Sequence, residues 1–163
     1  MSKLFYIKKA LGKNNKKLNI YKFRTMKPGS ARREVYSRKK LDKFGKPKNS
    51  EMITPMGRFL RKYWLDEIPQ IYQVLIGNMS LVGIRPRSAK SWKIYPKRHK
   101  KRALKYKPGL ISATNAFELK SFNDLLKAEQ KYLDDYEKNP WKTQILYLKK
   151  IMFNIFFNGL RSR

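Results

Sequence analysis

The most informative segment of this chain reads Leu65-Asp66-Glu67-Ile68-Pro69-Gln70. Proline is tolerated in an α-helix only in the first turn, where its missing N–H would be unpaired in any case and its fixed φ fits. A helix is therefore expected to begin near Asp66, and Gly77-Asn78 ends it. This placement puts Asp66 and Glu67 at a helix N-terminus, where free N–H groups and the macrodipole favour anions.

Short elements precede this segment. Two apolar stretches, residues 4–7 and 18–26, enclose a polar turn rich in Gly, Asn and Lys, which predicts a β-hairpin. Residues 27–50 carry many Lys and Arg and few apolar side chains among Pro and Gly, which predicts a long basic loop. Thr54 and Pro55 then look like an N-cap and a first helical residue, and they open a helix with apolar residues at three- and four-residue spacing.

The chain that follows is mainly helical. We expect a short extended segment over 81–87, a basic helix over 98–105, a turn at 107–109, and a helix over 121–137 with Ser121 as its cap. Pro140 restarts an amphipathic helix over 140–158. Because the length suits about one domain, residues 1–163 are expected to form a single helix-rich α+β domain with a short N-terminal β-hairpin.

Charge and composition exclude several classes of site. Lys and Arg number 40 against 11 Asp and Glu, which gives a formal net charge of +29. Such a chain should meet polyanions, meaning nucleic acid, an acidic membrane surface or phosphorylated substrates. The absence of cysteine excludes a thiolate nucleophile and Cys-ligated zinc, and a single histidine, His99, excludes multi-histidine metal sites. His99 lies among lysines and arginines and is expected on the surface.

Asp66 and Glu67 are the strongest candidates for chemistry. Adjacent side chains on a helix diverge by about 100°, so the two carboxylates would not share one proton but could do two jobs, one attacking and one holding a metal. The alternative interpretation is structural, because acidic residues in a first helical turn complement the helix dipole.

Five ordered blocks of the sequence resemble the bacterial sugar transferases, which are monotopic phosphoglycosyl transferases acting on polyprenol phosphate. The family pattern runs KFRTM, LRxxSLDELPQ, NVLxGDMSLVGPRP and RPGITG. The corresponding blocks here lie at residues 21–26, 57–62, 65–70, 74–86 and 107–109. The resemblance covers the chain from about Phe5 to Phe157, and five matches in order are highly specific.

The resemblance implies transfer of a sugar 1-phosphate from a nucleotide diphosphate-sugar, with a UDP-sugar as the expected donor, to polyprenol phosphate. This reaction initiates glycan or exopolysaccharide synthesis and uses Mg²⁺ and a covalent phosphosugar-aspartate intermediate. By matched position, Asp66 would be the nucleophile, Glu67 would help to place Mg²⁺, and three cations would hold phosphates: Lys22, Arg61 and Arg85. A carboxylate that attacks a diphosphate must overcome anion repulsion, which Mg²⁺ and guanidinium groups offset.

Several positions depart from the family pattern. They are Ile84 for the first Pro of PRP, Asn78 for the Asp of GDMS, Ile111-Ser112 for Thr-Gly, Leu119 for an Arg, and residues 144–146, where a C-terminal aspartate is absent. These changes keep a second hypothesis open, a catalytically degenerate relative that serves as a membrane-surface or partner-binding subunit. A third hypothesis, a nucleic-acid-binding protein, rests on net charge alone, and we expect no nucleic-acid partner.

Membrane attachment is expected to be peripheral. No apolar run approaches the roughly 20 residues that span a bilayer, and the family's N-terminal re-entrant membrane helix has no counterpart in this sequence. We therefore expect the chain at the cytoplasmic face of the membrane, held to an anionic surface by its net charge, with a partner chain as another source of an anchor. The helix over 140–158 keeps two interpretations, a core helix or an amphipathic helix in the membrane interface.

Overall fold

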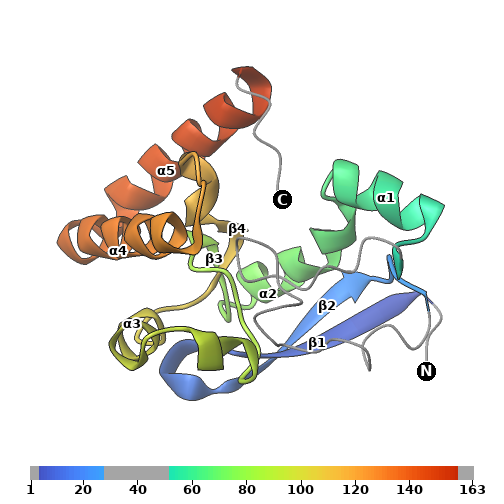
Figure 1. Cartoon of the computed structure of the whole chain (residues 1–163), viewed down its shortest axis with the longest axis horizontal. Helices are drawn as coiled ribbons and strands as arrows, with labels where there is room; N and C mark the ends of the chain where they lie inside the picture. Colours follow the sequence, from blue (N-terminus) through green and yellow to red (C-terminus); the bar gives the residue numbers. More distant parts are fainter. Residues whose placement is uncertain (1–3, 28–51, 158–163) are drawn as a thin grey trace.

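The structure, a computed structural model, describes residues 4–27 and 52–157 (Figure 1). With η marking a 3₁₀-helix, its elements are β1 (Phe5–Leu11), η1 (Lys13–Asn15), β2 (Lys17–Phe23), α1 (Pro55–Lys62), η5 (Leu65–Gln70), α2 (Ile71–Leu75), β3 (Ser80–Gly83), η6 (Ser91–Ile94), α3 (Lys97–Ala103), β4 (Gly109–Ser112), η7 (Ala113–Ala116), α4 (Phe122–Lys138) and α5 (Pro140–Phe157). Two small sheets among these helices confirm the predicted α+β class. The basic loop predicted over 27–50 lies outside the described residues apart from Lys27, as does residue 158 at the end of the predicted C-terminal helix.

β1 and β2 form the predicted N-terminal hairpin. They are antiparallel, with Phe5 opposite Phe23 at the open end. The chain reverses through η1, where Asn14 and Asn15 have φ values of 54° and 61°. Asparagine tolerates this left-handed region better than most residues, so the turn suits its sequence. Ile20 is fully buried beneath the hairpin, which fixes the face of β2 that points away from solvent.

A second sheet pairs β3 with β4 in parallel, and Val82 lies beside Ile111. The sequence predicted the extended segment that contains β3, but the interpretation of residues 107–109 as a turn was incomplete, because Gly109 is the first residue of β4. A parallel pair needs a long crossover, and here the crossover includes α3. Gln144 of α5 pairs with β3: its side-chain amide accepts from the Val82 N–H at 3.0 Å and donates to the Val82 carbonyl at 2.7 Å.

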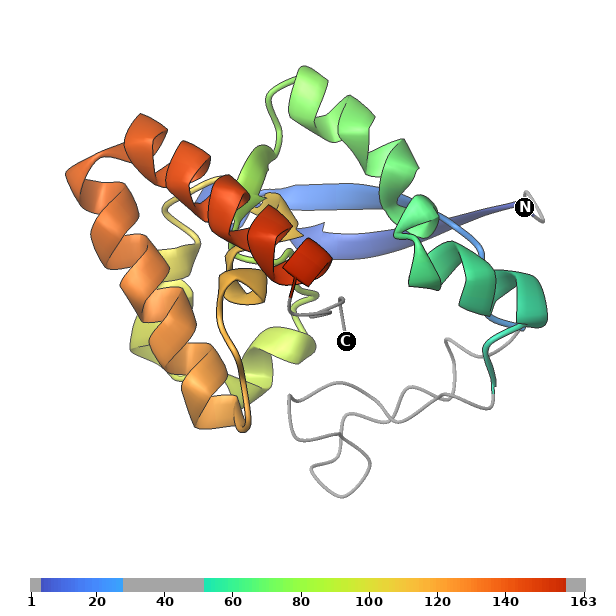
Figure 2. The same ribbon diagram turned by 90° about the horizontal axis from the view of Figure 1, so that it is seen from above.

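The main core lies between this sheet and the two long helices. α4 and α5 meet as the arms of a V (Figures 1 and 2), and buried side chains such as Leu133 and Ile151 fill the space between them and β3. Ser121 caps α4 as predicted, within a full capping box that Asp124 completes. The opposite side of α5 exposes apolar side chains, including Phe153 and Phe156. Among the described residues, no helix is both long enough and apolar enough to cross a bilayer.

α1 packs through a glycine on the segment that follows β2, and most of the larger apolar side chains of α1 face outward. Thr54 caps the helix as predicted, with its hydroxyl accepting from the Gly57 N–H at 2.9 Å. Gly57 is buried so closely against Thr25 that an added Cβ would lie 2.1 Å from the Thr25 carbonyl oxygen. The apolar residues Met56 and Phe59 are therefore on the exposed side, 66% and 53% accessible.

The segment from Leu65 to Gly77 folds differently from the single helix that its sequence predicts. Residues 65–70 form the 3₁₀-helix η5, and the α-helix proper, α2, begins only at Ile71. Pro69 explains the difference, because it lacks an N–H and disfavours α geometry at the residue before it. Asp66 and Glu67 still lie in a first helical turn, and Gly77, at φ 75°, ends the segment as predicted.

The expectation that His99 lies on the surface was wrong. His99 on α3 is only 4% exposed, and its Nε2 lies 2.7 Å from Glu129 Oε2 on α4. A carboxylate buried 30 positions further along the chain thus draws the imidazole inward, which local composition could not reveal.

The close contact at Gly57 yields a test of how α1 is held. Alanine normally stabilises a helix interior by about 1 kcal/mol relative to glycine. In Gly57→Ala, however, the methyl group would collide with the Thr25 backbone, so we expect a net loss of about 1–3 kcal/mol in unfolding free energy, measured by urea denaturation. Gly12→Ala is the matched control, since its nearest heavy atoms lie at 3.6 Å; equal stability of both variants would contradict this packing.

Candidate active site

The predicted site residues converge from separate segments. Glu67 on η5 is the centre, because its Oε1 accepts from Lys22 Nζ of β2 at 2.5 Å and from Arg85 Nη2, beyond β3, at 2.6 Å. All three side chains are largely shielded from water, with exposed fractions of 18–30%. Such charge-assisted contacts are stronger than neutral hydrogen bonds, so Glu67 joins β2, η5 and the segment after β3.

The electrostatics of the site separate the two carboxylates. Burial alone would raise the pKa of Glu67, but the charges of Arg85 and Lys22 and the Lys22 hydrogen bond outweigh it and lower that pKa to about 2. Burial raises the pKa of Asp66, against the opposing charge of Lys22. Burial, aided by the charge of Arg85, also lowers the pKa of Lys22. Glu67 is thus a firmly ionised ion-pair partner, whereas Asp66 is a desolvated carboxylate, the more basic of the two.

Arg61 enters the site from α1. Its Nε donates to the Thr25 hydroxyl at 2.9 Å, and Thr25 is the residue against which Gly57 packs. The charge of Arg61 acts on the pKa of Asp66 and stabilises its ionised form. Arg61 has no carboxylate partner within ion-pair distance among the described residues, so its terminal guanidinium nitrogens are available for an anionic ligand.

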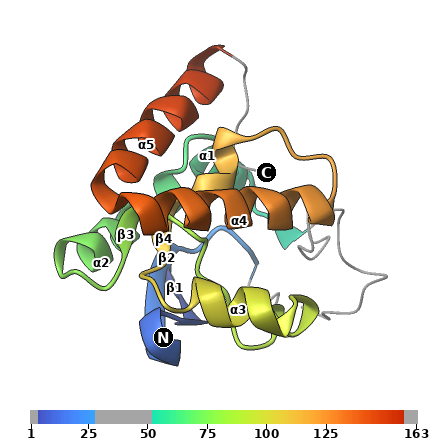
Figure 3. The same cartoon turned by 90° about the vertical axis from the view of Figure 1, so that its left-hand side faces the viewer.

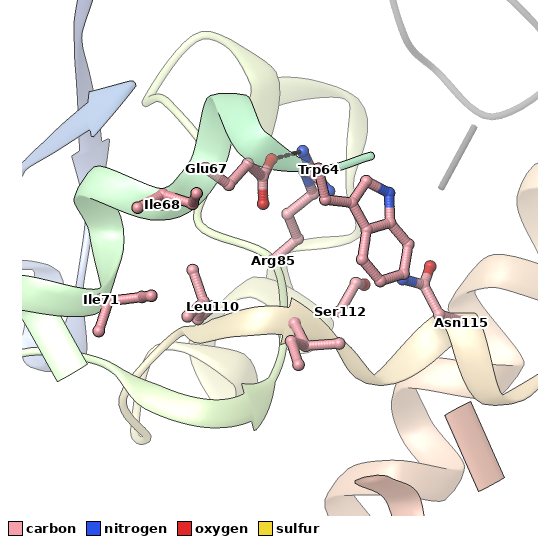
Figure 4. Close-up of a pocket in the computed structure, with 9 residues that line it drawn as sticks. Trp64, Glu67, Ile68, Ile71, Arg85, Leu110, Ser112 and Asn115 are labelled. Atoms are coloured by element: carbon pink, nitrogen blue, oxygen red, sulfur yellow. Dashed lines mark hydrogen bonds and ion pairs between the residues drawn. The ribbon is translucent and has the colours of Figure 1, made fainter. Parts of the chain in front are cut away.

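A pocket of about 160 Å³ opens beside the ion pair (Figure 4). Its wall is formed by Trp64, Glu67, Ile68, Ile71, Arg85, Leu110, Ile111, Ser112 and Asn115. In Figure 4 the aliphatic side chains line one part of the pocket, and Trp64, Ser112 and Asn115 lie together at the opposite part. The Glu67–Arg85 contact lies between these two parts of the wall. Trp64 has φ 58°, a left-handed conformation that a large residue adopts at a cost. The pocket therefore combines an apolar cavity with a charged edge.

The two carboxylates fit a magnesium ion only if the substrate shares in binding it. Both cation contacts of Glu67 use Oε1, which leaves Oε2 as the atom that could face a metal. Among residues 4–27 and 52–157, no group of three or more acidic, histidine or cysteine side chains is placed to hold a metal ion. Mg²⁺ commonly binds one or two carboxylates and completes its shell with phosphate oxygens and water, so the donor set is compatible with a substrate-assisted site.

The positions that depart from the family pattern divide into two groups. Asn78 ends the α2 segment and donates to the Gln73 side chain, Ile84 is buried in the core, and Leu119 packs against that core. None of these three lines the pocket, whereas Ile111 and Ser112 both do. Sequence reasoning singled out the last two only as departures, and it missed Trp64 and Asn115 altogether as pocket residues.

Comparisons with known proteins agree on one family. The family model described as bacterial sugar transferase matches residues 1–156. The galactosyl transferase CpsE of Streptococcus agalactiae is 31% identical over 134 residues, which cover 77% of this chain and 29% of that protein. An undecaprenyl-phosphate galactose phosphotransferase of Salmonella typhimurium is 42% identical over 83 residues, covering 47% of this chain and 17% of that protein.

A third relative matches nearly the whole chain. The UDP-glucose:undecaprenyl-phosphate glucose-1-phosphate transferase of Escherichia coli is 27% identical over 154 residues, which are 93% of this chain and 32% of that protein. The chain thus spans less than a third of the length of each of these relatives.

The low pKa of Glu67 predicts how its ion pairs respond to acid. Its pKa is about 2 in the folded chain and 4.5 ordinarily, a difference worth about 3 kcal/mol. Because the folded pKa is the lower one, this stabilisation is fully present above about pH 5 and is lost as the pH falls toward 2. The stability gap between wild type and Glu67→Gln, followed by urea denaturation, should be constant from pH 7 to 5 and then narrow. The exposed Glu118→Gln is the control, and a gap that does not change down to pH 2 would refute the ion-pair account.

Proposed function

Because this chain belongs to the bacterial sugar transferase family, we propose that it transfers a sugar 1-phosphate from a UDP-sugar to a polyprenol phosphate, the first step of glycan or exopolysaccharide assembly. The observation that carries this proposal is the pairing of a buried carboxylate, Asp66, with a cation-bound neighbour, Glu67, beside a pocket. Relatives named for this chemistry act on undecaprenyl phosphate, which supports the acceptor class.

In the proposed mechanism Asp66 is the nucleophile. A carboxylate oxygen attacks the phosphorus that bears the sugar, the bond to the nucleotide breaks, and UMP leaves with the bridging oxygen. The resulting phosphosugar-aspartate is then attacked at phosphorus by the phosphate oxygen of the polyprenol phosphate, which releases the lipid-linked sugar and restores the Asp66 carboxylate. Burial supports this role, since a desolvated carboxylate with a raised pKa is more nucleophilic than one in water.

Three cations would offset the repulsion between Asp66 and the diphosphate. Lys22 and Arg85 meet at Glu67, and Arg61 acts on Asp66 from α1. In the proposed complex Arg61 and Arg85 contact the phosphate oxygens with their planar guanidinium groups, which match phosphate geometry, and Lys22 supplies a point charge. This arrangement stabilises charge where it develops during transfer.

Magnesium completes the proposed site. Glu67 would hold Mg²⁺ together with diphosphate oxygens, while Asp66 remains the nucleophile. When bound, the ion would neutralise charge on the diphosphate and make phosphorus more electrophilic.

The pocket suits the lipid acceptor better than the sugar. Its aliphatic wall includes Ile68 and Ile71, which also belong to an exposed apolar stripe that continues along α2 to Leu75. A cavity of about 160 Å³ compares with the roughly 150 Å³ apolar cavity that accommodates benzene, and an isoprene unit is of similar size. We assign the pocket to the isoprene unit next to the acceptor phosphate.

The membrane supplies that acceptor. Figures 1 and 3 share a vertical axis, and both show α1 and the far end of α5 on one side of the molecule, away from α3. Exposed apolar side chains such as Phe59 on α1 and Phe153 and Phe156 on α5 could enter the interface there. We propose peripheral attachment at the cytoplasmic face, with the net charge of +29 drawing the chain to anionic lipid and a partner chain as an additional anchor.

The nucleophile can be tested directly. With a panel of UDP-sugars and Mg²⁺, intact-mass spectrometry should detect the phosphosugar adduct on wild type, and polyprenol phosphate should discharge it into extractable lipid. Asp66→Asn should show no adduct and no product while melting at an unchanged temperature, because asparagine keeps the shape and suits a helix start. Asp134→Asn, a change on exposed α4, should behave as wild type.

Two outcomes would contradict this assignment. Turnover by Asp66→Asn would remove Asp66 from the mechanism. Absence of adduct and product with wild type, under every donor and with Mg²⁺ present, would favour the degenerate membrane-surface or partner-binding subunit instead.

Peripheral attachment has its own signature. The chain should co-sediment with phosphatidylglycerol vesicles at low salt, bind phosphatidylcholine vesicles weakly, and be released near 1 M salt, where the Debye length falls to about 3 Å. Phe153→Ser/Phe156→Ser should reduce binding several-fold without lowering the melting temperature, because the two side chains are 55% and 73% exposed. Ile7→Ser, exposed on the hairpin, is the control. Binding that ignores lipid charge and salt would refute this mode.

A further inference from the structure

A second charged cluster lies inside the molecule, and none of its three residues, Arg87, His99 and Glu129, lines the pocket. Glu129 on α4 is fully buried, and its Oε1 accepts from Arg87 Nη2 at 2.5 Å while its Oε2 lies 2.7 Å from His99 Nε2. Burial alone would raise the pKa of Glu129, but the charge of Arg87 and the hydrogen bond from His99 hold it below its usual value. The cluster is therefore an ionised carboxylate shared by an arginine and a histidine.

Arg87 is fixed on further sides. Its guanidinium carbon lies 4.3 Å from the ring centroid of Tyr95 and 5.0 Å from that of Trp92, both cation–π distances. The backbone carbonyl of Arg87 accepts from the Leu11 N–H at 2.9 Å, at the end of β1. With the Glu129 contact, these interactions hold both the side chain and the backbone of Arg87, which makes it a rigid point in the segment that follows β3.

That rigid point lies next to the candidate phosphate site. Arg87 Nη1 is 3.5 Å from the carbonyl oxygen of Arg85, and Pro86 restricts the backbone between them. Arg85 in turn reaches Glu67 Oε1 at 2.6 Å. A continuous series of contacts thus runs from α4 through Glu129 and Arg87 to the backbone of Arg85 and into the site.

We propose that Arg87, held by Glu129 and His99, is a positioning residue that fixes the backbone of Arg85 so that its guanidinium meets the diphosphate of the nucleotide sugar. This inference rests on the proposed function for its substrate. Guanidinium–phosphate contacts are directional, and a displacement of about 1 Å in a positioning element can cost on the order of a hundredfold in rate. Arg87 itself touches no substrate.

The alternative is that the cluster only stabilises the fold, and a paired substitution separates the two roles. Removing one partner of a buried ion pair is strongly destabilising, because it leaves a buried charge uncompensated, whereas replacing both partners is often nearly neutral. Arg87→Met/Glu129→Gln should therefore regain most of the stability lost by either single variant. The paired variant should not, however, regain the contact of residue 87 with the Arg85 carbonyl oxygen, which positions the Arg85 backbone.

The experiment measures UDP affinity by calorimetry in the presence of Mg²⁺, turnover with a UDP-sugar, and the melting temperature. We expect Arg87→Met/Glu129→Gln to melt within a few degrees of wild type yet bind UDP about tenfold more weakly. Arg87→Lys keeps the charge but loses the fork and should show a similar loss. Arg102→Lys is the matched control, because Arg102, like Arg87, pairs with carboxylates of α4, here Asp134 and Glu137, but on the surface. The UDP affinity of this control variant should stay within twofold of wild type.

A substrate-free measurement keeps this inference separate from the proposed function. The coupling between Arg85→Met and Glu67→Gln, measured as a double-mutant cycle in stability, should be clearly smaller in the Arg87→Met/Glu129→Gln background than in wild type. An unchanged coupling, or wild-type UDP affinity in the stable paired variant, would overturn the positioning role. If the coupling is lost in the Arg87→Met/Glu129→Gln background but the wild type neither binds UDP nor shows turnover, the positioning of Arg85 would be supported and the proposed function would be refuted.

Discussion

The ion pairs of Glu67 hold together parts of the chain that no local force would join. Lys22 lies 45 positions before it and Arg85 18 positions after it. A shielded carboxylate is tolerated only when its partners compensate the loss of hydration, so the hairpin, η5 and the segment after β3 cannot move independently. The chain has 40 basic and only 11 acidic residues, so few carboxylates are available to join segments through buried ion pairs. Glu129 joins α3, α4 and Arg87 in the same way as Glu67 joins its partners.

The placement of a charged residue also explains why the apolar side of α1 faces outward. A helix usually docks through its large apolar residues, but this one docks through Gly57, and the close approach brings Arg61 within reach of Thr25. Bringing a guanidinium to the site therefore leaves Met56 and Phe59 exposed. Exposed apolar side chains favour aggregation in water, whereas in the proposed membrane attachment these side chains would be buried in the interface.

Local features of the sequence were sufficient for much of the fold. The Thr54-Pro55 start of α1, the Ser121 cap of α4 and the hairpin each depend on neighbouring residues, and each was predicted correctly. The strand at Gly109 and the burial of His99 depend on distant partners, whereas the 3₁₀ geometry of η5 follows from Pro69 within the segment itself. These three predictions failed or were incomplete. The site residues were grouped through the family resemblance, since nothing near Lys22 or Arg85 in sequence indicates that both reach Glu67.

The Gln144 amide has a consequence for the order in which the chain is made. It occupies the N–H and carbonyl of Val82, so α5 protects backbone groups of β3 that would otherwise be open. Gln144 is synthesised 62 residues after Val82, and until α5 has left the ribosome β3 exposes a backbone that can pair with another chain. A nascent or truncated polypeptide that ends before α5 is thus prone to aggregation, although every residue that lines the pocket is already present.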